Sequence, residues 1–257
     1  KNKNFLTIQS SRGCSFNCDY CSYMVVQGGK TRNRNLDLIK MEIEQLITKY
    51  EVRSLLFRDI LFGHPKSRFH EIVEVLSEFN GKIEWGCETR IELLTNEVVK
   101  KSVNSGMKLV NIGIESPNIK ILSKNGKKTF GNDETASRVN YMNDLGVNVQ
   151  AFYMLGLVGD DNQSILDTIK YAKKLNTFAA QFCLPTPYPG TKFAEDNLDS
   201  TYENDLETYD AYTPQLKVDG MTKSDLKNMH SYAYRSYYLN PNWIRKNLFK
   251  AVKNIIL

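Results

Sequence analysis

Three of the five cysteines lie close together in the segment RGCSFNCDYCSY, as Cys14, Cys18 and Cys21. Three residues separate the first two, and two residues separate the second from the third. Three thiolates on one short loop can hold a cubane 4Fe-4S cluster, because each takes one iron and the fourth iron keeps no protein ligand. The spacing therefore predicts a cluster with one iron open to another molecule.

Other uses of these cysteines fit the sequence less well. A structural zinc site normally takes a fourth Cys or His, and His64, His70 and His230 lack ligand spacing to the trio. A disulfide framework is typical of small secreted domains, but the first residues, KNKNFLTIQS, lack the apolar stretch of a signal peptide. Cys87 and Cys183 stand alone in apolar segments, and we interpret them as buried packing residues.

Apolar segments alternate with amphipathic ones, and together they must position the cysteine segment. Val, Ile, Leu and aromatic residues predict six strands, at Phe5–Gln9, Ser54–Phe57, Ile83–Cys87, Leu109–Ile114, Val149–Leu155 and Phe178–Leu184. Helical spacing predicts helices around residues 36–46, 69–79, 98–103, 136–145 and 165–172. Ser67 and Thr95 are predicted N-caps, and Gly106 and Gly146 are predicted to end helices.

Repeated strand-helix units predict an α/β fold, a partial TIM-like (β/α)6 barrel with mostly parallel strands and a helical C-terminal extension. In such folds ligands gather at the carboxyl ends of the strands. The informative residues follow the six strands in turn, as Arg12 to Cys21, Asp59, Glu88 and Arg90, Glu115, Gly156 and Gly159, and Pro187. One shared site at this end of the barrel accounts for all of them.

The regular alternation stops after Thr191, which predicts two parts. The barrel is expected over residues 1–192, and an acidic loop with a helical extension over residues 193–257. Tyrosines and a tryptophan are expected to pack this extension against the barrel, with stacking on a substrate as the alternative; they are Tyr232, Tyr234, Tyr237, Tyr238 and Trp243.

Composition restricts the kinds of binding partner and the cellular compartment that we expect. Lys and Arg outnumber Asp and Glu by 34 to 29, and we interpret patches such as Lys30, Arg32 and Arg34 as solvated faces more than nucleic-acid contacts. The sequence holds no apolar run of about 18 residues. We therefore expect a cytoplasmic protein without a membrane span.

The cysteine trio, with Tyr20 just before its last member, resembles the signature of the radical S-adenosylmethionine (radical SAM) superfamily. The likeness runs from about Leu6 to Thr191 through LLFRD, WGCETR, NIGIES, FYMLGLVGD and PTPYPGT. It implies that the open iron binds S-adenosylmethionine. One electron from the cluster then gives methionine and a 5′-deoxyadenosyl radical, which abstracts hydrogen from a substrate.

These motifs and the tail segment AYRSYYLNPNWI are most similar to the branch that carries a cobalamin-binding domain ahead of the radical SAM domain. That domain is absent from this sequence, and the first residue is Lys rather than Met. The resemblance therefore implies that the chain is the catalytic part of a longer enzyme that uses cobalamin.

The resemblance implies roles for individual residues. It assigns the iron to Cys14, Cys18 and Cys21, and it puts the backbone around Tyr20 and Ser22 near the adenine or methionine end of S-adenosylmethionine.

Period-2 alternation in NIGIES supports a further role. If Glu115 faces inward, so does Gly113, while Ile112 and Ile114 face the helices. Glu115 is then placed to accept hydrogen bonds from ribose hydroxyls.

The same parity points Gly86, Glu88 and Arg90 to one side, which puts a cation where the methionine carboxylate can be paired. A structural ion pair between Glu88 and Arg90 is the alternative. Asp59 matches the first acid of an acidic pair in this branch, but Ile60 occupies the second position, which leaves the role of Asp59 open.

Gly156 and Gly159 allow the backbone to approach a nucleoside closely, with an ordinary strand-to-helix turn as the alternative. Ser116 and Tyr153 complete the predicted cofactor-binding set. No catalytic residue is predicted, since Tyr153, Tyr188 and the tail tyrosines are equivalent candidates for a proton donor.

The resemblance implies a radical SAM enzyme of transferase, cyclase or isomerase type, acting on a small-molecule natural product by methylation, cyclisation or rearrangement. It implies an electron donor such as flavodoxin or ferredoxin. A methylthiotransferase is one alternative, although such enzymes usually add a second cluster domain and a small β-barrel. A non-enzymatic iron-sulfur module is the other, but it would more often supply four ligands.

Overall fold

The structure is a computed structural model that describes residues 4–202 and 205–247. One sheet has the strand order β1 (Asn4–Ile8), β4 (Val52–Phe57), β5 (Glu84–Thr89), β6 (Met107–Glu115), β7 (Asn148–Met154) and β8 (Ala179–Cys183). Each neighbouring pair is parallel. The six predicted strands are confirmed, with ends that differ by no more than two residues.

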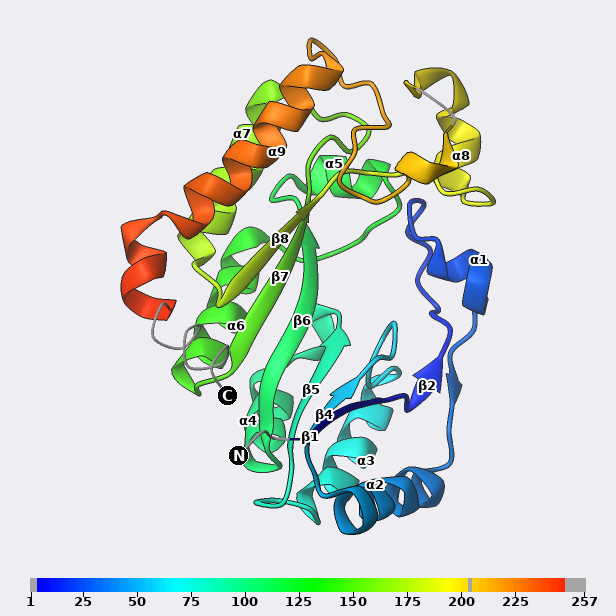
Figure 1. Cartoon of the computed structure of the whole chain (residues 1–257), viewed down its shortest axis with the longest axis vertical. Coiled ribbons are helices and arrows are strands. Elements are labelled where there is room, and N and C mark those ends of the chain that lie inside the picture. The colour runs from blue at the N-terminus through cyan, green and yellow to red at the C-terminus, as the bar shows by residue number, and fades with distance from the viewer. Residues whose placement is uncertain (1–3, 203–204, 248–257) are drawn as a thin grey trace.

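The sheet curls into a half-barrel and stays open, with β1 and β8 as its edges (Figure 1). The predicted partial α/β barrel is therefore confirmed. Helices connect successive strands, as α2 (Leu36–Tyr50), α3 (Lys66–Ser77), α4 (Asn96–Asn104), α6 (Asn132–Asp144) and α7 (Asn162–Leu175).

Residues 241–247, at the end of the described chain, are helical. Shorter elements and one more helix lie before them. They are β2 (Ser11–Arg12), α1 (Tyr23–Gln27), β3 (Arg32–Asn33), η1 (Ile91–Leu93), α5 (Ile119–Lys124), α8 (Lys192–Asp196), η2 (Leu198–Ser200), η3 (Leu206–Thr208) and α9 (Lys223–Tyr238). The strands β2 and β3 pair with each other in an antiparallel ribbon. Within the described residues, no helix is both long and apolar enough to cross a membrane.

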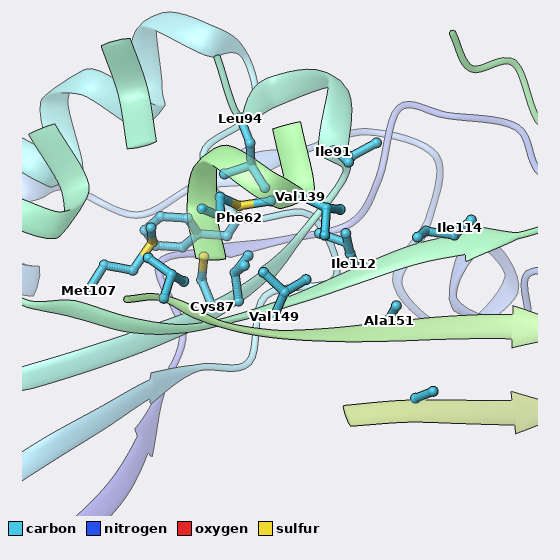
Figure 2. Close-up of a cluster of buried hydrophobic side chains, with 14 of the residues drawn as sticks. Phe62, Cys87, Ile91, Leu94, Met107, Ile112, Ile114, Val139, Val149 and Ala151 are labelled. Atoms are coloured by element: carbon cyan, nitrogen blue, oxygen red, sulfur yellow. The ribbon is translucent and has the colours of Figure 1, made fainter. Parts of the chain in front are cut away.

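The hydrophobic core lies between the sheet and the helices that cover its convex face. Figure 2 shows Cys87, Ile112 and Val149 from adjacent strands, together with Leu94 and Val139. All five are fully buried. The interpretation of Cys87 as a packing residue agrees with this position.

Three of the four predicted helix-capping residues lie at helix ends in the structure. The Thr95 hydroxyl accepts a hydrogen bond from the Val98 amide at the start of α4. Gly106 and Gly146 follow α4 and α6 with φ of +101° and +79°, which glycine adopts at little cost. The prediction for Ser67 is wrong, because α3 begins one residue earlier, directly after Pro65, whose fixed φ suits a helix start.

The edge strand β8 is covered by α9. The Tyr238 hydroxyl accepts a hydrogen bond from the Ala180 amide at 3.0 Å and donates one to the Ala180 carbonyl at 2.8 Å. The Tyr234 hydroxyl makes the same pair of bonds with Phe182, at 3.1 and 3.3 Å. These hydroxyls satisfy backbone groups that an edge strand would otherwise leave unpaired.

The aromatic residues beyond them continue this contact. Tyr237 donates to the Thr177 carbonyl at 2.7 Å, and Trp243 donates to the Phe178 carbonyl at 3.1 Å. Packing of the tail is thus confirmed for four of its aromatic residues. It is wrong for Tyr232, whose side chain is 44% exposed. The last ten residues of the predicted extension, 248–257, lie outside the described residues.

Candidate functional site

The three cysteines lie in a loop, residues 13–22, that follows β2 and that we call the cysteine loop. Its first residue, Gly13, has a φ of +79°, and a Cβ there would lie 2.2 Å from the Lys30 carbonyl oxygen. The Gly13 amide donates to Gln27 Oε1 at 3.2 Å, and the Cys14 amide to the Gly28 carbonyl at 3.4 Å. Only glycine allows the loop to approach the segment after α1 this closely.

The far part of the cysteine loop is held between α5 and α8. The Asp19 amide donates to the Asn125 carbonyl at 3.3 Å, and the Asp19 carbonyl accepts from the Phe193 amide at 3.1 Å. A cavity of about 250 Å³ opens between the loop and residues 190–192, and Cys18 and Cys21 line it. The loop is therefore fixed at both ends and exposes two thiols to a cavity.

The three thiols are free and act on one another electrostatically. Burial raises the pKa of Cys14 and of Cys21, and the nearby Cys18 raises the pKa of both further. Gathered thiolates at partly buried positions need a compensating cation. This donor set fits a cluster that takes one thiolate on each of three irons. No group of three Cys, His, Asp or Glu side chains among the described residues is arranged to hold a single metal ion.

Arg90 lies against the cysteine loop. Its Nη1 is 3.8 Å from the Cys18 Sγ, and its guanidinium stacks over the Phe16 ring at 4.3 Å from the centroid. A 3.0 Å ion pair with Glu92 fixes the other side of the guanidinium. Arg90 thus brings a positive charge to the thiols. The alternative pair with Glu88 does not form, since Glu88 lies 3.8 Å from Arg58.

Glu115 sits at the carboxyl end of β6, where a β-bulge changes the register with β7. Its φ is +66°, and its Oε1 would lie 2.3 Å from a Cβ on Gly113, so these two residues share a side, as the alternation predicts. Lys127 Nζ donates to Glu115 Oε1 at 2.9 Å and to the Gly113 carbonyl at 2.7 Å. Lys127 reaches the pair from the loop after α5, and no local sequence pattern distinguishes it from a solvated basic residue.

Tyr20, in the cysteine loop, lies near enough to this carboxylate to be affected by its charge. Its ring packs against Ile121, Leu122 and Leu157. Burial, followed by the charge of Glu115, raises the pKa of Tyr20 well above its usual range, so its hydroxyl stays protonated as a hydrogen-bond donor. Ser22 is the residue before α1, and its side chain makes no capping bond.

Asp59 and Ser116 are buried and hydrogen-bonded within the protein. Asp59 accepts from the Ser10 amide at 3.0 Å and from the Ser11 hydroxyl at 2.6 Å, and so holds the segment that leads into the cysteine loop. The Ser116 hydroxyl accepts from the Asn118 amide at 3.1 Å. Both side chains thus order the backbone around the site.

Tyr153 and Gly156 lie differently from the prediction. Tyr153 is fully buried in the convex-side core, where its ring stacks on Phe182 at 5.4 Å. It points away from the site because alternation along β7 puts Phe152 and Met154 on the concave side. A Cβ on Gly156 would lie 3.1 Å from Val218 Cγ2, so the chain itself covers this glycine.

The concave face of the half-barrel carries a row of polar side chains below the mouth. Glu88, Asn111 and Gln150 are aligned by the strand register across β5, β6 and β7. Asn111 is 6% exposed, and its Oδ1 has no hydrogen-bond partner among the described residues. Cys183 belongs to this face as well and is only half-buried, which corrects its interpretation as a fully buried residue.

The fold and the site together define a class of protein. It is a parallel half-barrel that carries free thiols, an arginine and a buried carboxylate at the carboxyl ends of its strands. Residues 8–172 match the Radical SAM superfamily. The chain therefore belongs to the radical SAM superfamily of enzymes, whose cofactors are a 4Fe-4S cluster and S-adenosylmethionine.

Two curated relatives cover nearly all of the chain. An uncharacterized methyltransferase of Pyrococcus horikoshii is 28% identical over 250 residues, which are 96% of this chain and 54% of that protein. The anaerobic magnesium-protoporphyrin IX monomethyl ester cyclase of Rubrivivax gelatinosus is 25% identical over 247 residues, 95% of this chain and 44% of that protein. The chain thus spans about half the length of these relatives.

A solved structure has the same fold. The radical SAM methyltransferase TsrM from Kitasatospora setae, with cobalamin and a [4Fe-4S] cluster bound, gives a TM-score of 0.69 at 16% identity. The match covers 88% of this chain and 46% of that one. At this identity the likeness concerns the fold.

Proposed function

We propose that Cys14, Cys18 and Cys21 hold a 4Fe-4S cluster and that this chain cleaves S-adenosylmethionine bound to its fourth iron. The observation that carries the proposal is the gathering of three free thiols in one fixed loop at the mouth of the half-barrel. When bound, the cluster supplies the electron that splits S-adenosylmethionine into methionine and a 5′-deoxyadenosyl radical.

Arg90 offsets the negative charge of the thiolates. Its Nη1 faces the Cys18 Sγ at 3.8 Å, while Glu92 and the Phe16 ring hold its other atoms. A guanidinium fixed in this way beside Cys18 can also pair with the methionine carboxylate. We assign it both tasks.

Glu115 and Tyr20 orient the nucleoside part of S-adenosylmethionine. Lys127 holds one oxygen of the Glu115 carboxylate, and the other oxygen can accept hydrogen bonds from ribose hydroxyls. The backbone around Tyr20 and Ser22 borders the same end of the site. Asp59 and Ser116 support it indirectly, through the backbone that they order.

We propose a small-molecule substrate and a reaction that is a methylation, a cyclisation or a rearrangement, assisted by cobalamin on another part of the protein. The names of the methyltransferase and cyclase relatives support this range of reactions. A low-potential donor such as flavodoxin or ferredoxin would supply the electron.

Electron paramagnetic resonance of the anaerobically reconstituted and reduced chain tests the proposal. We expect a 4Fe-4S signal that changes when S-adenosylmethionine is added. The signal should vanish in the triple variant C14A/C18A/C21A. It should persist in C183A, a matched control because Cys183 is a half-buried free thiol outside the cysteine loop.

Two outcomes contradict the proposal. If no iron binds, the chain has no cluster. If a cluster forms but its signal ignores S-adenosylmethionine, an electron-transfer module is favoured.

A further inference from the structure

A second cavity, of about 740 Å³, lies beside the edge strand β1, and four arginines line it. We call it the arginine pocket; its arginines are Arg12, Arg32, Arg34 and Arg58. They come from β2, β3 and the residues that follow β3 and β4, segments that meet at one side of the half-barrel (Figure 1). The pocket is therefore built by the fold and not by one basic run of sequence.

The positive charge of this pocket is only partly balanced. Glu42 is the one carboxylate among the residues that line it, and it pairs with Arg34 at 2.6 Å. Arg32 donates to the main-chain carbonyls of Gln27 and Lys30, at 2.7 and 3.1 Å, which are neutral groups. The exposed Arg12 side chain makes no hydrogen bond or ion pair with the described residues.

Several guanidinium groups around a hollow focus a positive potential there. Arginine also presents a planar set of donors that matches phosphate and carboxylate oxygens. The volume is within the range of pockets that hold small molecules, about 300–1,000 Å³. An anionic group is the ligand that this lining fits.

The pocket lies at the open edge of the sheet, and residues from both sides of that edge line it, Ile8 and Glu42 of α2 on the side of the helices. Ile8 is buried in the convex-side core, so Thr7, its neighbour in β1 and a lining residue, faces the other way. Arg58 lies 3.8 Å from Glu88, which begins the polar row of the concave face. A ligand held by Arg58 can therefore extend along that row toward the cysteine loop.

We propose that the arginine pocket binds the anionic group, a phosphate or a carboxylate, of the small-molecule substrate. This assignment rests on the proposed function, because it takes the concave face as the place where the substrate lies. It also revises the interpretation of Arg32 and Arg34 as a merely solvated face. The neutral, hydrogen-bonding part of the substrate would lie along Asn111, whose Oδ1 lacks a partner among the described residues.

Calorimetric titration of the reconstituted chain with pyrophosphate and, separately, with succinate tests the anion site and tells the two groups apart. R12Q and R58Q should each weaken binding of the preferred anion about tenfold, as expected when one charge-assisted contact is lost. R53Q is the matched control, because Arg53 is exposed on β4, the strand that Arg58 directly follows, but lines a different cavity. The R53Q variant should bind the anion as tightly as the unaltered chain does. Added salt should weaken anion binding to each of these two proteins.

The proposal is wrong if neither anion binds, or if R53Q weakens binding as much as R58Q does. It is also wrong if a transfer RNA binds where both small anions fail, since the surface would then belong to a nucleic acid. R58Q keeps the test decisive if R12Q disturbs the adjacent cysteine loop. The variant C14A/C18A/C21A should still bind the anion, so failure of this site is distinguishable from failure of the cluster.

Discussion

At the scale of single residues, the cysteine loop depends on a glycine as well as on its thiols. Gly13 combines a φ of +79° with a main-chain neighbour that leaves no space for a Cβ. A neighbouring backbone cannot move aside as a flexible side chain can. The geometry of the thiols is therefore set one residue before the first cysteine.

We expect G13A to lower the iron bound per chain after reconstitution severalfold, because the Cβ would push the loop away from Lys30. The control is G131A. Gly131 has a φ of −67°, and no atom lies within 4 Å of a Cβ built there. Equal iron content in the two variants would show that the loop tolerates the displacement.

The buried pair of Lys127 and Glu115 is the second prediction at this scale. Their side chains are only 6% and 12% exposed. K127M should lower the free energy of unfolding by about 3–5 kcal/mol, because it leaves a buried carboxylate without its partner. Urea denaturation measures the change.

K101M is the control for this prediction, because Lys101 forms a 3.0 Å pair with Glu97 in which both side chains are more than half exposed. Little change in stability is expected for it, since solvent screens such a pair. A K127M protein as stable as K101M would mean that Glu115 needs no cation.

At the scale of elements, α9 closes the edge of β8 through tyrosine hydroxyls. Tyr234 and Tyr238 are four residues apart on the helix, so they lie on one face. They bond Phe182 and Ala180, which are two residues apart in the strand and so present their backbone groups to the same edge. The four-residue spacing of the tyrosines on the helix thus matches the two-residue spacing on the strand. The edge of β8 gains hydrogen-bond partners without another strand.

Y234F/Y238F should destabilise the protein by about 2–6 kcal/mol, from about 1–3 kcal/mol for each tyrosine whose loss leaves backbone groups unpaired. Amide hydrogen exchange at Ala180 and Phe182 should speed up as well. Y232F is the control, because Tyr232 lies on the same helix with an exposed side chain. Unchanged exchange at both amides in the double variant would contradict the closure of this edge.

At the scale of the whole molecule, the half-barrel is open between β1 and β8. In the described chain, α9 covers the edge at β8, whereas the arginine pocket lies beside the edge at β1. The polar row of the concave face begins beside the arginine pocket, at the pair of Glu88 and Arg58. This hydrogen-bonding surface supports the proposal of a polar substrate.

The use of cobalamin is a prediction for the complete protein. Purified after growth with cobalamin, a longer protein that contains this chain should show a corrinoid absorbance spectrum, and the present chain alone should not. A corrinoid-free protein that still turns over its substrate would rule out this role for cobalamin.

The sequence by itself determined the class of the fold and the three thiols. Both rest on local patterns: runs of strand-forming residues, helical spacing, and cysteines a few residues apart. The fixed repeats of strands and helices turn such patterns into structure directly. That is why the six strands and two glycine helix ends agree with the structure.

Only the tertiary structure decided which distant residues meet. Lys127 reaches Glu115, Arg58 reaches Glu88, and four arginines from three segments share one pocket. No local repeat encodes these pairings. The bulge at Glu115 likewise sets Tyr153 opposite a residue whose side chain lies on the other side of the sheet. Such contacts depend on how strands register and curl, which is a property of the packed sheet.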